Sequence, residues 1–330
     1  MLGTGFPRNT RDAARKHRCN EGSVSSRHAG AAVLSRLAGS VFRVGAAVER
    51  ADVLARLLDV YLARSDAASG AGERIVSREL RVVAGAAVRP ATVLDRHTTL
   101  ESLALDRHQP ASIAAAVAVA RDDARRARDV VSTELWDCLN VTRSRMPRKI
   151  AGGREHEFLG WVRERSALAI GVVEGDASRD EVWEFFTLGR SLARCAATAR
   201  LLASDLLEPE SAASWGTALR ACGAGEAFQR ATGSGAPASE AAAFLLLDDR
   251  SPRSMLFLTL RAEECLADVA PAAVTEELDD LRGARRALQA LAPAEAVDAA
   301  RAAGQRLAAV ADRVAGALDA RVFAAAEPTH

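Results

Sequence analysis

Four charged side chains of one predicted helix could form a binding or catalytic strip. Glu49, Asp52, Arg56 and Asp59 are spaced so that, at about 100° of rotation per helical residue, they fall within an arc of about 80°. Carboxylates beside an arginine could accept a proton, bind the amides of a peptide, or bind a carboxylate through the guanidinium. Arg50 points to a different side of the same helix. These five residues are the first candidates for a functional site.

The apolar residues around the strip predict that part of it is buried. Between residues 34 and 62 apolar side chains recur at steps of three and four, and beyond residue 52 a second side of the helix is apolar too. We expect a central helix about 45 Å long. A buried charge needs a partner, and Asp52 and Arg56 are spaced to form one pair. Three interpretations stay open: ion pairs that fix the register of packed helices, a ligand or catalytic site, and a solvated face.

The sequence around this helix recurs later in the chain. Residues 44–58 resemble residues 188–202, at an offset of 144. A second echo, at an offset of 142, aligns Leu105, Asp106, Pro110 and Ser112 with Leu247, Asp248, Pro252 and Ser254. Two echoes at nearly the same offset indicate an internal duplication.

The second copy keeps the arginines of the strip and loses its acids. Arg194 and Arg200 stand in place of Arg50 and Arg56, whereas Ala193, Ala196 and Ala203 stand in place of Glu49, Asp52 and Asp59. Arg194 and Arg200 therefore need carboxylates from another helix, from a bound anion or from a partner protein. Both are candidate binding residues.

A second dense run of charges begins at Arg121. Within residues 121–129, Asp122 and Arg126 are four residues apart, as are Arg125 and Asp129, and such pairs are typical of a solvated helical face. Arg121 is kept as a further candidate for partner binding.

Composition restricts the class of protein. Its 330 residues are 49% hydrophobic and only 4% aromatic, and Ala, Leu and Arg dominate, which favours helices. The net charge of +1 gives no long-range attraction for nucleic acid or an anionic membrane. Neither the five cysteines nor the six histidines have metal-site spacing, and nucleotide-binding and hydrolase motifs are absent. We expect a cytoplasmic protein with no metal, no cofactor, no disulfide framework and no membrane-spanning segment.

We predict an all-α protein, a long-helix bundle built from an internal duplication whose halves are related by a pseudo-two-fold axis. Residues 1–30 are basic and poor in large apolar side chains, which predicts a disordered extension. Residues 33–150 are assigned to a first helical repeat and residues 151–330 to a second, packed together as one bundle. After the first long helix we expect helices at about 73–88, 110–142, 154–174, 179–205, 210–222, 237–247, 252–269, 273–291 and 294–323.

These motifs resemble those of the alpha-E domain family, a bacterial all-helical family named for its Glu-Arg motif. The motif is similar to Val48-Glu49-Arg50-Ala51-Asp52 here, and its second occurrence is reduced to Ala193-Arg194. Further similar stretches are Asp106 to Ile113, Ala120 to Trp136, Trp161 to Leu168, Arg179 to Trp183 and Phe244 to Ser254. The resemblance implies a component of gene clusters that also encode ATP-grasp ligases and transglutaminase-like proteins, and hence a part in making or modifying peptides.

We therefore expect a non-enzymatic accessory protein that binds an ATP-grasp-type ligase, a transglutaminase-like protein or a peptide in a charged groove between its helices. One alternative is an enzyme that uses Glu49 or Asp52 as a general base in a buried cleft. Another is a structural dimerisation module, a homodimer in which the ion pairs only set helix register.

Overall fold

The computed structural model describes residues 24–65, 70–89, 91–270 and 272–324, with side chains of the first helix from residue 37 to residue 61. All regular elements within these ranges are helices, and no strand occurs in them. The predicted extension lies outside the described residues as far as residue 23, whereas its last part, residues 24–30, belongs to the first helix. The helices are α1 (Val24–Ser65), α2 (Ala71–Val83), α3 (Arg96–Ala104), α4 (Ile113–Arg126), α5 (Thr133–Ser144), α6 (Glu155–Asp176), α7 (Glu181–Ala203), α8 (Ala212–Ala221), α9 (Gly225–Thr232), α10 (Ala238–Leu247), α11 (Met255–Val269), α12 (Thr275–Gln289) and α13 (Ala296–Ala317), with short helical turns η1 (Pro293–Glu295) and η2 (Leu318–Phe323).

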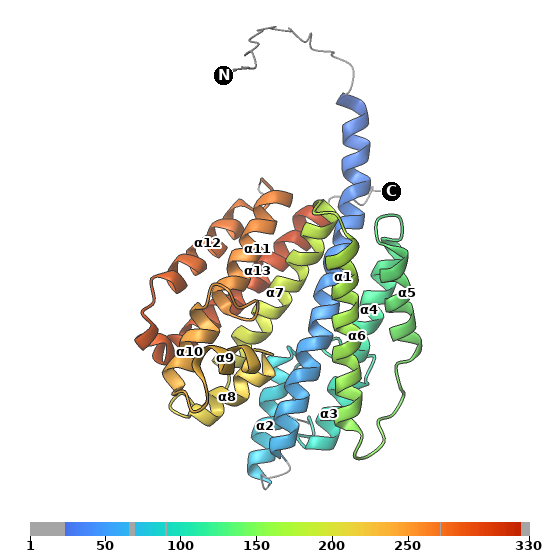
Figure 1. Cartoon of the computed structure of the whole chain (residues 1–330). Helices are drawn as coiled ribbons and strands as arrows, with labels where there is room; N and C mark the ends of the chain where they lie inside the picture. Colours follow the sequence, from blue (N-terminus) through green and yellow to red (C-terminus); the bar gives the residue numbers. More distant parts are fainter. Residues whose placement is uncertain (1–23, 66–69, 90, 271, 325–330) are drawn as a thin grey trace, which may run out of the picture.

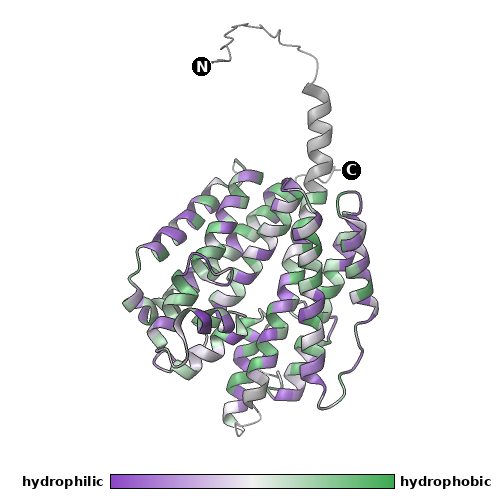
Figure 2. Ribbon diagram, in the orientation of Figure 1, coloured by the Kyte–Doolittle hydropathy of each residue, from purple (hydrophilic) through white to green (hydrophobic). Residues whose placement is uncertain are grey.

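Two long helices, α1 and α7, lie side by side at the centre of the molecule (Figure 1). α1 also packs against α4 and α6, and α7 packs against α11 and α13. The side of α1 that carries Val44, Ala51 and Leu58 is buried, because apolar side chains at steps of three and four share one face. Hydrophilic residues of α5 and α12 face outward at the two edges of the molecule (Figure 2). α1 is thus the central helix that its apolar pattern predicts.

Glycines allow α1 and α7 to touch. A Cβ atom built on Gly45 of α1 would lie 2.1 Å from the carbonyl oxygen of Phe186, and one built on Gly189 of α7 would lie 2.2 Å from the carbonyl oxygen of Phe42. Both distances are far below a van der Waals contact, so only glycine fits at these two positions. This close approach brings the charged residues that follow Gly45 and Gly189 next to the opposite helix.

The helices after α1 and those after α7 follow in the same order. α2, α3, α4, α5 and α6 begin at residues 71, 96, 113, 133 and 155, and α8, α10, α11, α12 and α13 begin at 212, 238, 255, 275 and 296. Each start is therefore repeated about 142 residues later, and α9 has no equivalent in the first series.

The loops before α4 and α11 share their hydrogen bonds. The Ser112 hydroxyl donates to the Asp106 carbonyl oxygen and accepts from the Ala115 amide at 3.0 Å. The Ser254 hydroxyl likewise donates to the Asp248 carbonyl oxygen and accepts from the Phe257 amide at 3.1 Å. Both serines cap the first turn of a helix.

Several predicted boundaries are wrong. The helix expected at 110–142 is two helices, because the chain turns after Arg126 and Ser132 caps a new helix by accepting from the Leu135 amide. α3, capped by Asp95, and α9 are short helices that the apolar pattern did not predict. α11 begins at Met255 and not at residue 252, since the capping residue is Ser254. In the part of the chain that the structure describes, no helix is long and apolar enough to cross a membrane.

Candidate functional site

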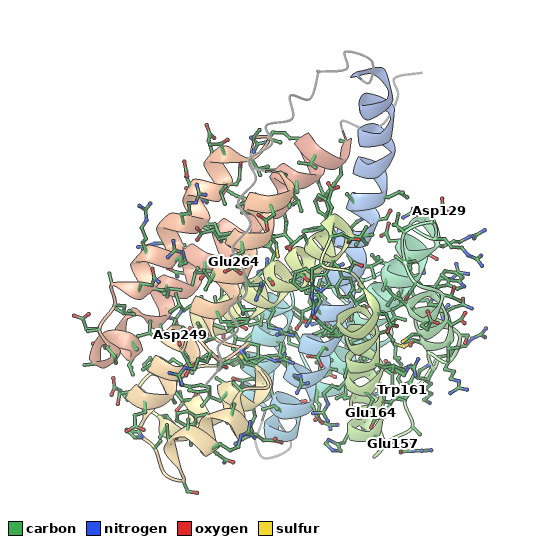
Figure 3. All side chains as sticks on the ribbon, turned by 45° about the horizontal axis from the view of Figure 1, so that its top comes forward. Asp129, Glu157, Trp161, Glu164, Asp249 and Glu264 are labelled. Carbon is green, nitrogen blue, oxygen red and sulfur yellow. The ribbon has the colours of Figure 1, made fainter. Side chains whose placement is uncertain are left out.

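Glu49 and Asp52 lie where α1 meets α7 and the loop before α11. Glu49 has no exposed surface and Asp52 is 2% exposed. They lie four and seven residues beyond Gly45, on the side of α1 that meets the second half of the chain. By contrast, Glu157, labelled at an edge of the molecule in Figure 3, is exposed, and so is Glu264. The predicted burial of part of the strip is confirmed.

Glu49 is paired with an arginine from the other long helix. Arg194 Nε and Nη2 donate to the two oxygens of Glu49 at 2.5 and 2.7 Å, and Arg194 Nη1 donates to the Pro252 carbonyl oxygen at 2.9 Å. Two further arginines approach the same carboxylate, Arg190 at 3.5 Å and Arg253 at 3.7 Å. The sequence predicts that Arg194 needs a carboxylate from another helix, from a bound anion or from a partner protein, and Glu49 of the first Glu-Arg motif supplies it.

These arginines determine the ionisation of Glu49. Burial by itself would raise the pKa of this carboxyl group, but the charge and hydrogen bonds of Arg194, followed by the charges of Arg253 and Arg190, outweigh it and lower the pKa to about 2. Burial lowers the pKa of Arg190 and of Arg253. Glu49 is thus a fixed anion, and an anion of such low basicity is a weak proton acceptor.

The lowered pKa predicts a specific loss of stability in acid. The Glu49 pKa is about 2 in the folded protein and 4.5 in the unfolded chain. The stabilisation of the fold by the ionised carboxylate is therefore complete above about pH 4.5 and is lost as the pH falls toward 2. Between about pH 5 and pH 3, urea unfolding of the native protein should lose about 2 kcal/mol more than that of Glu49→Gln. Equal losses in the two proteins would contradict a charged, buried Glu49.

Asp52 extends the pairing. Arg56 Nε donates to its carboxylate at 2.9 Å, which confirms the predicted pair four residues apart, and Arg253 Nη1 donates at 3.2 Å. Arg253 therefore bridges Asp52 and Glu49. We call Glu49, Asp52, Arg190, Arg194 and Arg253 the Glu49 cluster.

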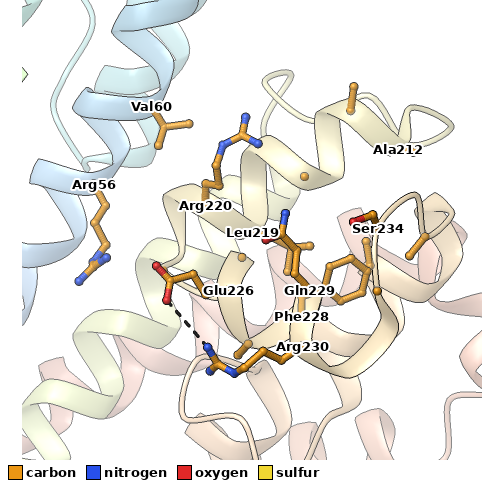
Figure 4. Close-up of a pocket in the computed structure, with 18 of the residues that line it drawn as sticks. Arg56, Val60, Ala212, Leu219, Arg220, Glu226, Phe228, Gln229, Arg230 and Ser234 are labelled. Atoms are coloured by element: carbon orange, nitrogen blue, oxygen red, sulfur yellow. Dashed lines mark ion pairs between the residues drawn. The ribbon is translucent and has the colours of Figure 1, made fainter.

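Arg56 and Asp59 mark the edge of the buried region. They line a cavity of about 790 Å³ between α1, α6 and the α8–α10 segment, which we call the Arg220 cavity. Asp59 accepts from His156 Nδ1 at 2.5 Å and lies 3.4 Å from Arg163 Nη1. In Figure 4, Arg56 and Val60 on α1 lie across from Arg220 and Glu226 on the α8–α9 side. The charged residues of the lining are Arg56, Asp59, Arg163, Arg220, Glu226 and Arg230.

The remaining candidates lie outside the cluster. Arg50 and Arg200 line a different cavity, of about 430 Å³, which we call the Arg50 cavity. Arg200 donates to Asp312 of α13 at 2.6 Å, so an acid of another helix pairs with it. Arg121 lies on α4, where it pairs with Asp122 and stacks on Trp136 of α5, 5.3 Å from the ring centre. Arg121 is not brought together with the other candidates.

The predicted pairs around Arg121 differ from those in the structure. Arg126 pairs with Asp123 at 2.9 Å, and Asp123 also accepts from Arg43 of α1. The predicted pairs of Asp122 with Arg126 and of Arg125 with Asp129 are replaced by these contacts, because α4 ends at Arg126 and Asp123 faces α1.

Sequence reasoning missed two arginines of the cluster. Arg190 precedes Arg194 by one helical turn and so shares its face, and this spacing could have identified it. Arg253 follows Pro252 in the repeated loop, but its counterpart in the first echo is Ala111, so the repeat gave no signal for it.

Metal ligands and thiols are two further kinds of group that could do chemistry in the described residues. In that part of the chain, no three His, Cys, Asp or Glu side chains gather so that they could hold a metal ion. Cys138, Cys195, Cys222 and Cys265 are free and buried, and burial raises the pKa of Cys195 to about 12 and that of Cys222 to about 11. A thiol with so high a pKa is a poor nucleophile.

The fold and the cluster define an all-helical protein whose two central helices are joined by a buried pair between the Glu of a Glu-Arg motif and a distant Arg. The Alpha-E family, described as a predicted alpha-helical domain with a conserved ER motif, matches residues 33–321. The chain belongs to the Alpha-E family. Comparison with curated proteins gave no match, and comparison with solved structures gave none either.

Proposed function

We propose that this protein is a non-enzymatic binding component of an ATP-grasp-type peptide ligation or modification system, and that it holds a peptide in the Arg220 cavity. The observation that carries the proposal is the lining of this cavity, where four arginines face two acids. Its volume of about 790 Å³ falls within the range of about 300–1,000 Å³ that is usual for ligand sites.

Arg220 is the best anchor for an anionic peptide group. It donates to the Thr217 hydroxyl at 3.2 Å, and no carboxylate of the described residues lies within ion-pair distance of it. Arg56 and Arg163 are close by but already lie against Asp52 and Asp59. Residues of the Gly225–Thr232 helix also line the cavity beside Arg220.

The partner would carry out the reaction, and a ligase partner would also bind the ATP. We propose an ATP-grasp-type ligase or a transglutaminase-like protein in this role, on the basis of the family's gene clusters. We also propose a location in the cytoplasm, where such a ligase finds ATP.

The surroundings of Glu49 and Asp52 favour a role in positioning α1 and α7 over a role in catalysis. Neither residue lines the Arg220 cavity, the Arg50 cavity or the cavity beside Arg194. A general base works best with a pKa near the working pH, and the pKa of Glu49 is about 2. The inner charges therefore fit the interpretation that they fix the register of α1 and α7, while Arg56 and Asp59 reach the binding cavity. Whether two copies associate as a homodimer stays a prediction.

We infer that an internal duplication with a pseudo-two-fold axis produced this arrangement. The reciprocal contacts of Gly45 with Phe186 and of Gly189 with Phe42, the shared order of helices and the matched loops before α4 and α11 support it. Since α6 corresponds to α13, we place the boundary between the halves at residues 177–180 and not at residue 150.

Binding of an acidic peptide tests the Arg220 cavity. A fluorescein-labelled peptide of alternating Glu and Ala should raise its anisotropy on binding, and Arg220→Gln should weaken the binding about tenfold, because a charge-assisted hydrogen bond is lost.

Two controls make this result specific. The same peptide with Gln in place of Glu should not bind, and Arg306→Gln, at an exposed position of α13 outside the cavity, should bind like the native protein. If Arg220→Gln and Arg306→Gln weaken binding equally, the cavity is not the peptide site.

A further inference from the structure

The Arg50 cavity lies where the proposed duplication would put a second Glu49 cluster. It is lined by α1, α7 and the loop before α4, as the Glu49 cluster is formed by α1, α7 and the loop before α11. Residues 83–85, α13 and η2 also contribute to its lining. In one place the space is filled by charged side chains, and in the other there is a cavity of about 430 Å³.

Four alanines explain why this space is open. At the repeat offsets of 144 and 142, Glu49 and Asp52 correspond to Ala193 and Ala196, Arg190 corresponds to Ala46, and Arg253 corresponds to Ala111. All four alanines line the Arg50 cavity. Of the charged residues in the Glu49 cluster, only Arg194 therefore has a charged counterpart at the Arg50 cavity. The counterparts of the others carry only a methyl group.

The remaining charge is Arg50, the counterpart of Arg194. Arg194 is held by Glu49 and by the Pro252 carbonyl oxygen, and the corresponding residues for Arg50 are Ala193 and Pro110, both in the lining of the cavity. Among the described residues no carboxylate lies within ion-pair distance of Arg50. Arg50 is exposed to solvent, and the partial burial of its guanidinium beside the cavity lowers its pKa.

The other charges of the lining are mostly neutralised. Arg43 is paired with Asp123 at 3.0 Å, and Arg200 with Asp312 at 2.6 Å. Asp319 also lines the cavity and is exposed. Much of the remaining surface is aliphatic, including Leu54, Leu57 and Leu192. An anion with an aliphatic body would match a lone guanidinium beside such walls.

We propose that the Arg50 cavity binds a carboxylate carried on a short aliphatic group. Arg50 would bind this carboxylate as Arg194 binds the carboxylate of Glu49. The residue equivalences rest on the duplication proposed above, and the site is separate from the Arg220 cavity. The carboxylate could belong to a small free acid or to the C-terminal residue of a peptide, which offer the same chemistry.

Calorimetric titration of the full-length protein with hexanoate tests this assignment. Hexanoate should bind with a stoichiometry of one, hexanamide should not, and Arg50→Gln should weaken hexanoate binding about tenfold or more. Arg220→Gln should leave hexanoate binding unchanged, so that failure of this site and failure of the peptide site can be told apart. Titration of Arg220→Gln, in which the proposed peptide site is impaired, with acetyl-Gly-Leu, whose carboxylate ends a peptide, distinguishes the two sources: tighter binding than hexanoate assigns the Arg50 cavity to a peptide terminus, and weaker binding to a free acid.

Ala193→Glu provides a second, independent test. If the new carboxylate pairs with Arg50 as Glu49 pairs with Arg194, this variant should lose hexanoate binding and unfold at a higher temperature than Ala193→Gln, which has the same size without the charge. The proposal would be overturned if Ala193→Glu bound hexanoate as tightly as the native protein does. It would also be overturned if the native protein bound hexanoate and hexanamide equally.

Discussion

Replacing Glu49 by Gln should lower the free energy of unfolding by about 3–5 kcal/mol, because removing one partner of a buried ion pair leaves the others buried without compensation. In this protein three arginines, Arg190, Arg194 and Arg253, lie within 4 Å of the Glu49 carboxylate. Glutamine keeps the size of the side chain, so the loss measures charge and not packing. Urea unfolding monitored by circular dichroism gives the value.

A matched control isolates the effect of burial. Glu157 also accepts two hydrogen bonds from one arginine, Arg154, but both side chains are more than half exposed. Water and salt screen such a pair, so Glu157→Gln should change the stability little. Similar losses for the two substitutions would mean that Glu49 is not the charge on which the packing of α1 and α7 depends.

The parts of the site that could be predicted from the sequence are those encoded within one helix. The pairing of Asp52 with Arg56 and the burial of part of the strip follow from spacing and from the apolar residues around them. The expectation that Arg194 needs a carboxylate from another helix, a bound anion or a partner also followed, since the sequence echo shows which acids are missing around it.

The identity of that carboxylate could not be predicted. Glu49 and Arg194 are separated by 145 residues, and their contact depends on the place where α1 and α7 meet. That place is fixed by Gly45 and Gly189, whose role becomes visible only when the two backbones are seen in contact. The same limit hid Arg253, and it hid the Arg220 cavity, which is built partly by α9, a short helix with little apolar pattern.

The contact between the two long helices gives the second large expected effect. Gly45→Ala should destabilise the fold by about 3 kcal/mol, because overpacking forces a backbone shift. The added Cβ would lie 2.1 Å from the Phe186 carbonyl oxygen, and backbone atoms of a packed helix cannot turn away as a side chain can. Gly189→Ala, with 2.2 Å to the Phe42 carbonyl oxygen, should act alike.

Glycines without neighbours serve as controls for helix propensity. Gly171 of α6 and Gly283 of α12 have no atom within 4 Å of a built Cβ. Alanine is favoured over glycine in a helix by about 1 kcal/mol, so Gly171→Ala and Gly283→Ala should stabilise the protein or leave it unchanged. The sign of the change thus separates crowding from propensity. Stabilisation by Gly45→Ala would mean that α1 and α7 do not touch at this point.

A double-mutant cycle joins the two expectations. If Gly45→Ala pushes α7 away from α1, it also lengthens the contact between Glu49 and Arg194, which lies one helical turn further along α1. Glu49→Gln should then lower the free energy of unfolding less in the Gly45→Ala background than in the native protein. The difference between the two losses should exceed about 0.5 kcal/mol, the margin within which independent sites are additive. Additive losses would show that the helix contact and the ion pair stabilise the fold independently, and that the glycines do not position the charges.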